Sequence, residues 1–293
     1  MSAYLIFSLS SIAVFVALAA LLHLQFGRAG IVNFGVVGFV GLGMYTFGAL
    51  QVQYDWPYFA AMVVGILAAG VAGLLLGGVI LKLDDEAVLV STLAFATIVA
   101  HLVTTEKWLT NGVVGLGTLR YPFDVGSDTP RVFLGLTVLL AAAIMFYAYR
   151  LQSTPYGRLM LSIRDNEPLA KSLGKRTFRE KLIFFTISSA VMGLIGVMYG
   201  TMNQFLVPRM VGPGLTFVVW IALILGGKTR VMGALVGVLL TAGLFDIVIE
   251  SYVPIPKGWS NYIPDLKLML YGLTLVLVIM FRPRGVLGER GAR

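Results

Sequence analysis

Cysteine is absent from this sequence of 293 residues, and histidine and charged residues are scarce. The absence of cysteine excludes disulfide bonds and thiolate metal sites. The two histidines, His23 and His101, stand too far apart in the sequence to indicate a metal site. Charged residues make up 12% of the chain, which is about half of their usual share in soluble domains. This composition argues against a water-soluble globular domain.

Long apolar runs take the place of the missing charge. Hydrophobic residues account for 58% of the sequence, and its mean hydropathy is +0.89. Hydrocarbon offers peptide groups no hydrogen bonds, so apolar runs of about 20 residues cross bilayers as α-helices. We therefore predict an all-α, polytopic membrane protein with eight or nine transmembrane segments in one domain, residues 1–293. The predicted segments cover residues 4–24, 30–50, 58–81, 87–106, 132–149, 182–203, 215–225, 232–250 and 267–281.

The first and the seventh of these segments differ from an ordinary crossing helix. The first follows no basic stretch and is long for a signal peptide, which predicts a retained helix. The seventh, residues 215–225, would cover as a helix only about 16 Å of a hydrocarbon core about 30 Å thick. It is therefore a half-helix, a re-entrant segment, or a crossing helix with longer ends.

The positions of Lys and Arg predict the orientation, because basic residues gather in cytoplasmic loops. Placing residues 150–181 in the cytoplasm puts most of the 22 Lys and Arg residues on that side. The N-terminus then lies outside and the C-terminal tail inside, which favours nine crossings over eight. The same loops account for the net charge of +8, so we expect a lipid bilayer and no nucleic acid as a partner.

The stretch "STPYGRLMLSIRDNEPLAKSLGKRTFREK", residues 153–181, interrupts the apolar pattern with charge. Pro155 suits the first turn of a helix in which Leu159, Met160 and Ile163 share one face. A second and shorter helix is predicted to follow it.

The second helix of this loop carries its own start and stop signals. Asn166 is a good N-cap, Glu167 places a negative charge in the first turn, and Pro168 is tolerated there. Gly174 suits the left-handed position that ends such a helix. About two turns are too few to be stable in water alone, so the helix needs a supporting surface. From the residues alone, the segment is a lipid-bound interfacial helix, a plain connecting loop, or a docking helix for a cytoplasmic protein.

The segment "GRLMLSIRDNEPLAKSLG", residues 157–174, resembles the cytoplasmic coupling loop of ABC-importer permeases. In particular it resembles the branched-chain amino acid permease family, with the pattern G-R-x-x-x-A-I-R-[DE]-[DN]-E-x-x-A-x-x-[LM]-G, from which it departs at Ser162. Residues 26–46 resemble the family's G-x-x-G-x-x-[ND]-x-G stretch, and residues 217–240 resemble its W-x-x-[LM]-x-[LIV]-x-G-G helix and loop. The tail "MFRPRGVLGER" resembles the closing R-P-x-G-[LV]-x-G. Together the four patches are specific at the level of the family.

The resemblance implies a transport subunit that forms a membrane pathway, is not an enzyme and holds no cofactor. The implied partners are a homologous second permease, two cytoplasmic ATPase subunits that bind ATP and Mg²⁺, and an extracellular solute-binding protein. The implied location is the cytoplasmic membrane of a bacterium or archaeon. The implied substrates are branched-chain amino acids, while urea, short amides and other small amino acids stay open.

In the implied arrangement the second short helix docks in a groove of the ATPase, which favours the docking alternative for the loop. The coupling residues are then Arg158, Arg164, Asp165 and Glu167 for polar contacts, Leu169, Ala170 and Leu173 for the groove, and Asn166 and Gly174 at the caps.

Polar residues inside the apolar runs are candidates for the translocation pathway, because polar groups are costly in hydrocarbon. Glycines at residues 35, 38 and 41 add a smooth stripe that lines a pore or packs against a neighbour. The predicted pathway set is Asn33, Gly35, Gly38, Thr46, Asn203 and Gln204. The GxxxG pairs at residues 73/77, 196/200 and 233/237 predict close helix packing, within the chain or between subunits.

Two other classes of protein fit the sequence less well. The letters "GGKT" at residues 226–229 lack the upstream glycine of a nucleotide-binding P-loop, because Ala222 stands in its place. No acid–base pair, activated nucleophile or metal-ligand cluster stands out in the sequence, which argues against a membrane enzyme. An ion-coupled secondary transporter is the main alternative, although the predicted segments place no acidic residue at mid-membrane.

Overall fold

The structure is a computed structural model that describes residues 3–227 and 230–246, and residues 269–270, 272–274, 276–277, 280 and 285–286. This part of the chain is almost entirely helical, as predicted. The α-helices are α1 (Ala3–Leu22), α2 (Val36–Gln53), α3 (Tyr58–Ile80), α4 (Asp85–Thr105), α5 (Lys107–Thr110), α6 (Thr129–Ser153), α7 (Pro155–Asp165), α8 (Glu167–Ser172), α9 (Thr177–Asn203), α10 (Gly214–Gly226) and α11 (Val231–Val238).

Other short elements complete the secondary structure of the described residues. The π-helices are η1 (His23–Arg28) and η5 (Leu239–Asp246), and the 3₁₀ segments are η2 (Gly112–Val114), η3 (Gly126–Asp128) and η4 (Pro208–Val211). The strands β1 (Leu116–Gly117) and β2 (Phe205–Leu206) pair antiparallel.

Six helices in the described ranges are long and apolar enough to cross a membrane, and one bent helix pair would make a seventh. The predicted count of eight or nine segments is therefore not confirmed. The segments 232–250 and 267–281 extend beyond the residues that the structure describes. The predicted segments that overlap one of the six helices along most of their length are 4–24, 30–50, 58–81, 87–106, 132–149 and 182–203.

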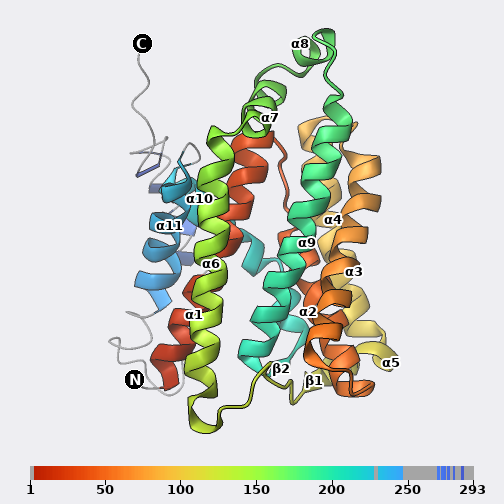
Figure 1. The fold of residues 1–293 in the computed structure, drawn as a ribbon, viewed down its shortest axis with the longest axis vertical. Helices are drawn as coiled ribbons and strands as arrows, with labels where there is room; N and C mark the ends of the chain where they lie inside the picture. The colour runs from red at the N-terminus through yellow and green to blue at the C-terminus, as the bar shows by residue number, and fades with distance from the viewer. Residues whose placement is uncertain are drawn as a thin grey trace.

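The predicted segment 30–50 is wrong at its start, because α2 begins only at Val36. Gly30 has a φ of +71°, which lies outside the right-handed helical region. The side-chain oxygen of Asn33 then accepts a hydrogen bond from the backbone N–H of Gly35 at 2.7 Å, just before the helix starts. Residues 30–35 are therefore non-helical, and α2 begins part-way along the molecule (Figure 1).

The predicted segment 215–225 corresponds to α10, a short helix that the chain reaches from β2 through η4. The 13 residues of α10 cover about 20 Å, less than the thickness of the hydrocarbon core. Its axis makes an angle of 118° with the helix that follows it. The second and the seventh predicted segments are here called the two interrupted segments, because the helix in each, α2 or α10, begins only after irregular backbone.

Glycines allow several pairs of helices to pack closely against each other. The helices α2, α3 and α9 pack together, as do α1 and α6 (Figure 1). A Cβ atom on Gly196 of α9 would lie 2.1 Å from the carbonyl oxygen of Val40 of α2. Gly73 and Gly77 of α3 face α9 in the same way, and the pair at residues 233/237 faces α10. All three GxxxG pairs therefore pack within the chain, one of the two predicted alternatives.

The helices α7 and α8 lie at one end of the molecule, here called the inner end, and the N-terminal helix starts at the opposite, outer end (Figure 1). This arrangement agrees with the prediction that the N-terminus and residues 150–181 lie on opposite sides of the membrane. Which side each end faces stays a prediction from the basic residues.

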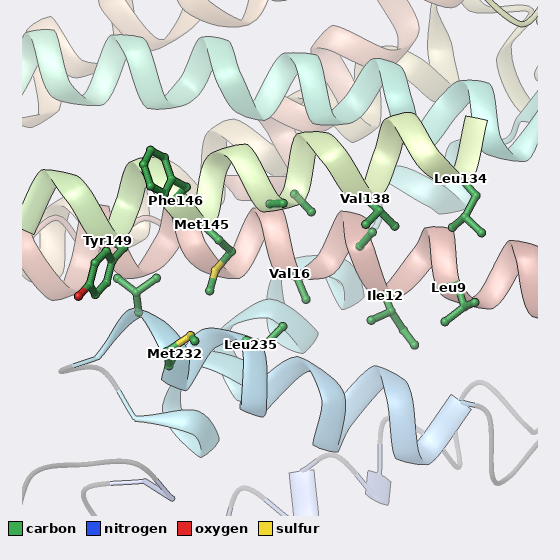
Figure 2. Close-up of a pocket in the computed structure, with 14 residues that line it drawn as sticks. Leu9, Ile12, Val16, Leu134, Val138, Met145, Phe146, Tyr149, Met232 and Leu235 are labelled. Atoms are coloured by element: carbon green, nitrogen blue, oxygen red, sulfur yellow. The ribbon is translucent and has the colours of Figure 1, made fainter. Parts of the chain in front are cut away.

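An apolar groove of about 690 Å³ lies between α1, α6 and α11. Figure 2 shows Leu9 and Ile12 of α1, Val138 and Met145 of α6, and Leu235 of α11 along it. None of the six predicted pathway residues is among the residues that line this groove. The groove therefore does not mark the predicted pathway.

Candidate functional site

Both helices of the inner loop start with a side-chain cap, and the cap of α8 is the one that the sequence predicts. Thr154 Oγ1 accepts a hydrogen bond from the backbone N–H of Gly157 at 3.1 Å and caps α7. Asn166 Oδ1 accepts one from the backbone N–H of Leu169 at 3.0 Å and caps α8. These bonds satisfy amide groups that a helix start leaves without a backbone partner.

The end of α8 also follows the prediction, because Gly174 has a φ of +77°. Its N–H donates to the carbonyl of Lys171 at 2.9 Å, and the N–H of Lys175 donates to the carbonyl of Ala170 at 3.1 Å. This pair of bonds is the Schellman arrangement that ends many helices. The six residues of α8 are thus fixed at both ends by local bonds.

Glu167 fastens α8 to the start of α9. Its carboxylate accepts hydrogen bonds from Lys181 Nζ at 2.6 Å and Thr177 Oγ1 at 2.8 Å, and Lys171 Nζ lies 3.1 Å away. Burial raises the pKa of this carboxyl, but the hydrogen bonds from Lys181, Thr177 and Lys171 outweigh that effect and lower it to about 2. The Glu167 side chain is therefore ionised, and its carboxylate is bonded to residues of its own chain.

The predicted coupling residues divide into an inward-facing and an outward-facing group. Ala170 is 4% exposed, whereas Leu169 and Leu173 are 56% and 70% exposed. Arg158 and Asp165 are also exposed. Leu169 and Leu173 are therefore the large apolar side chains that α8 and its C-cap expose, while Ala170 faces its own chain.

Arg164, another predicted coupling residue, contacts the π-helix η1. Its Nη1 atom donates to the carbonyl oxygen of Gly27 at 2.5 Å. Its side-chain stem lies on Gly30, where a Cβ atom would come within 2.9 Å of Arg164 Cγ. Next to this contact, Arg28 Nη2 donates to Gln152 Oε1 at 2.5 Å. The inner loop is therefore bonded to the start of the non-helical segment.

Asn33, a predicted pathway residue, lies in a buried network of neutral polar groups. Its Nδ2 donates to Gln25 Oε1 at 2.9 Å, and Gln25 Nε2 donates to Ser188 Oγ at 2.6 Å. Asn33 and Gln25 have no exposed surface. Because buried polar groups without partners are costly, this network stabilises the break before α2.

The two interrupted segments meet at this network. Trp220 Nε1 of α10 donates to the carbonyl oxygen of Asn33 at 3.0 Å, and its ring stacks on Phe34 with a centroid distance of 4.6 Å. Thr216 Oγ1 of α10 accepts a hydrogen bond from the N–H of Val37 at 3.1 Å. The start of α2 is therefore held by α10.

The other predicted pathway residues do not form one cluster with Asn33. Gly35 and Gly38 are buried where a Cβ atom on either would meet α4 within 2.8 Å. Thr46 is half-buried further along α2. Asn203 ends α9, and the exposed Gln204 follows it at the outer end in a left-handed conformation with φ of 57°. Their part in transport stays a prediction.

Five residues of the hydrogen-bond network around Asn33 are not among the predicted site residues. The signal that picked out Asn33, a polar side chain inside an apolar run, applies equally to most of them. The residues are Gln25, Thr92, Ser188, Thr216 and Trp220.

Long apolar helices, a capped and charged inner loop, and two interrupted crossings define a polytopic membrane permease. The chain belongs to the family described as branched-chain amino acid transport system permease component, whose model matches residues 4–279.

Named relatives of the chain are transport permeases. It is 29% identical over 299 residues to the high-affinity branched-chain amino acid transport system permease protein LivM of Escherichia coli, covering 94% of this chain and 68% of the relative. A probable branched-chain amino acid transport permease protein LivM of Methanocaldococcus jannaschii is 22% identical, with 92% and 89% covered. The autoinducer 2 import system permease protein LsrC of Escherichia coli O157:H7 is 28% identical, with 80% and 66% covered.

Proposed function

We propose that this chain is a membrane-spanning subunit of an ABC importer for branched-chain amino acids. It pairs with a homologous permease and lines the pathway, while two separate cytoplasmic subunits bind and hydrolyse Mg²⁺–ATP and an extracellular protein delivers the solute. The observation that carries the proposal is the capped α8 at the inner end, with two leucines turned outward.

The form of α8 supports docking on a protein over the two alternatives. Six residues do not form a stable helix in water, yet α8 is held by both caps and by Glu167. Leu169 and Leu173 are spaced i, i+4, so they share one face and fit an apolar groove. Figure 1 shows α8 projecting beyond the inner ends of α3 and α4, whereas an interfacial helix lies along the lipid surface.

The acidic residues argue against an ion-coupled secondary transporter. In the six described spans they occur at the starts of helices, as with Asp85 and Glu86 in the first turn of α4 and Glu180 in the first turn of α9. Ion coupling in the membrane usually relies on acidic groups inside the bundle. The neutral centre of this protein fits a transporter that draws its energy from ATP.

The substrate assignment rests on relatives that are named for branched-chain amino acids. Relatives named for autoinducer 2 import support a second candidate, a different small solute on the same machinery. Uptake by the complete importer in liposomes, with labelled leucine, isoleucine, valine and autoinducer 2 in competition, decides between the two. We expect the amino acids to compete with one another and autoinducer 2 to have no effect.

The docking role of α8 is tested by Leu173→Asp, which places a charge on the proposed contact. We expect the ATPase subunits to be lost when the variant is purified from membranes, while the variant itself is still inserted. Val113→Asp is a matched control, because Val113 is 74% exposed at the outer end. Normal ATPase retention and uptake by Leu173→Asp would overturn the docking role.

A further inference from the structure

We infer that Arg164 is a positioning residue that links the inner loop to the centre of the membrane domain. The inference rests on the proposed function and adds a route by which movement of the loop reaches the pathway. The route runs from Arg164 through η1 to Asn33, and from Asn33 to α10. The first and third steps are contacts between groups far apart in the sequence, and the second step is local.

The first step is the contact between Arg164 and the backbone of η1. The guanidinium donates to the Gly27 carbonyl at 2.5 Å, and the side-chain stem rests on Gly30. Position 30 requires glycine for two reasons. Its φ is +71°, and a Cβ atom there would come within 2.9 Å of Arg164 Cγ. The loop thus touches the chain where the regular helix has ended.

The second step lies within η1 and the segment after it. A π-helix is a rare, locally widened turn that often occurs at functional sites. From it, the Gln25 carbonyl accepts a bond from the N–H of Ile31 at 2.9 Å, and the Gln25 side chain binds Asn33. A shift of η1 therefore moves Asn33 directly, because backbone and side chain of Gln25 both hold the returning segment.

The third step joins the two interrupted segments. The carbonyl of Asn33 accepts a hydrogen bond from Trp220, and the start of α2 binds Thr216. Both partners belong to α10, so the position of Asn33 relative to η1 sets the contact between α2 and α10. Gln25 also binds Ser188 of α9, which connects the same point to the helix that follows the loop.

A cavity of about 350 Å³ beside the first contact leaves room for the loop to move. It lies between the non-helical segment, the loop and the starts of α4 and α9, and its lining includes Arg164, Val32, Asp85 and Lys181. The cavity leaves this side of residues 30–35 without close packing. The hydrogen bond from Arg164 to Gly27 therefore attaches the loop at a point where neighbouring atoms leave space for movement. Removing it takes away this attachment, while the bond from Arg28 to Gln152 and the apolar packing of α7 through Met160 and Ile163 stay.

The test uses Val218→Cys as a reporter in the assembled importer, because Val218 lies half-buried on α10 and has no polar group in the route. The sequence has no cysteine, so the V218C thiol is the only one that this subunit contributes. Its alkylation rate is measured with the ATPase subunits free of nucleotide and trapped with ADP and vanadate. We expect nucleotide to change the rate at least about threefold in the parent chain, within the usual range of coupling between distant sites.

Arg164→Met removes the donor but keeps a side chain on Gly30, and we expect it to abolish the nucleotide response. Arg164→Lys restores a donor and a response, and Arg179→Met, an exposed arginine in the first turn of α9, keeps the full response. Trp220→Phe, which keeps the ring but loses the donor to Asn33, lowers the response from the other end. Uptake per ATP hydrolysed falls in Arg164→Met and Trp220→Phe alike, and no further in the double variant.

A full nucleotide response in Arg164→Met, or strictly additive losses in the double variant, would overturn the inference. A parent chain that retains its ATPase subunits yet shows no nucleotide response at V218C would also overturn it. A parent chain that does not bind ATPase subunits would overturn the proposed function, and the inference with it.

Discussion

The inner tip and the membrane centre of this protein are both held by polar contacts, but of different kinds. At the tip, charged groups of Glu167, Lys171 and Lys181 meet within reach of water. At the centre, Asn33 and Gln25 use only neutral amide groups and have no exposed surface. Charge is costly to bury, whereas neutral amides are accommodated once every donor finds an acceptor.

The difference indicates that contacts at the tip break and re-form more easily than contacts at the centre. Contacts at the tip are partly screened and replaceable by water, so α8 changes its partners at low cost. Asn33 and Gln25 have no surface that bulk water reaches, so a bond lost there is not replaced, and the network moves as one unit or breaks at high cost. A tip that exchanges its contacts easily, joined to a stiff centre, suits the proposed coupling to ATPase subunits outside the membrane.

The largest effect is expected at the centre, from Asn33→Leu. The change leaves Gln25 Oε1 and the N–H of Gly35 without their partner, at a cost of about 3 kcal/mol in the free energy of unfolding. Titration of the purified chain from mild detergent micelles into SDS measures it. The control Thr97→Val removes an exposed hydroxyl that bonds only to its own helix, and should cost below about 0.5 kcal/mol. An equal loss of unfolding free energy in both variants would contradict the special role of the buried network at the centre.

A smaller and local effect is expected at the tip, from Glu167→Gln. Loss of the charged acceptor for Lys181 and Thr177 should lower the local stability of α8 by about 1.5 kcal/mol. Hydrogen exchange of the α8 amides should speed up, while exchange in α2 and in α9 beyond its first turns stays unchanged. Asp165→Asn, an exposed carboxylate beside α8, serves as the control. Faster exchange throughout the protein would show that the tip is not an independent unit.

The same carboxylate predicts a pH dependence confined to the tip. Burial raises the pKa of Glu167, but the hydrogen bonds from Lys181, Thr177 and Lys171 outweigh burial and lower the pKa from its ordinary value of 4.5 to about 2. A lowered pKa means that the contribution is complete above pH 4.5 and is lost as the pH falls toward 2. Exchange of the α8 amides should therefore lose protection in this window in the natural chain, but not in Glu167→Gln. Loss of protection already above pH 5 would contradict the assignment.

The smallest effect is expected from Gly174→Ala. The left-handed backbone disfavours a Cβ atom by about 1 kcal/mol, and no neighbouring atom lies within 4 Å to add a clash. Gly174→Asn should cost less, because asparagine tolerates this conformation. Exchange of the last α8 amides compares the two. An equal cost for alanine and asparagine would point to a steric origin instead.

The same contrast explains what the sequence predicts well. The caps of α7 and α8 depend on residues at most five positions apart, so Asn166 and Gly174 are recognised from local chemistry. The break before α2 depends on Trp220, which lies 187 positions from Asn33. Hydropathy treats residues 30–50 as one apolar run, and the position of Gly30 against Arg164 is set only by the folded chain.

Side-chain direction is the other feature that the loop sequence leaves open. Ala170 and Leu173 both belong to the motif, yet one faces the chain and the other faces away. Glu167 fits a partner contact in the sequence, and in the structure its partners are Thr177 and Lys181. Such assignments depend on where α9 begins relative to α8, which no local pattern specifies.

The measurement that tests the central claim most directly is solute uptake by liposomes that contain the complex purified from its native membrane. The account predicts uptake of branched-chain amino acids that requires ATP and the ATPase subunits and is indifferent to ion gradients. Uptake by this chain alone, driven by a proton or sodium gradient and unaffected by Leu173→Asp, would contradict it.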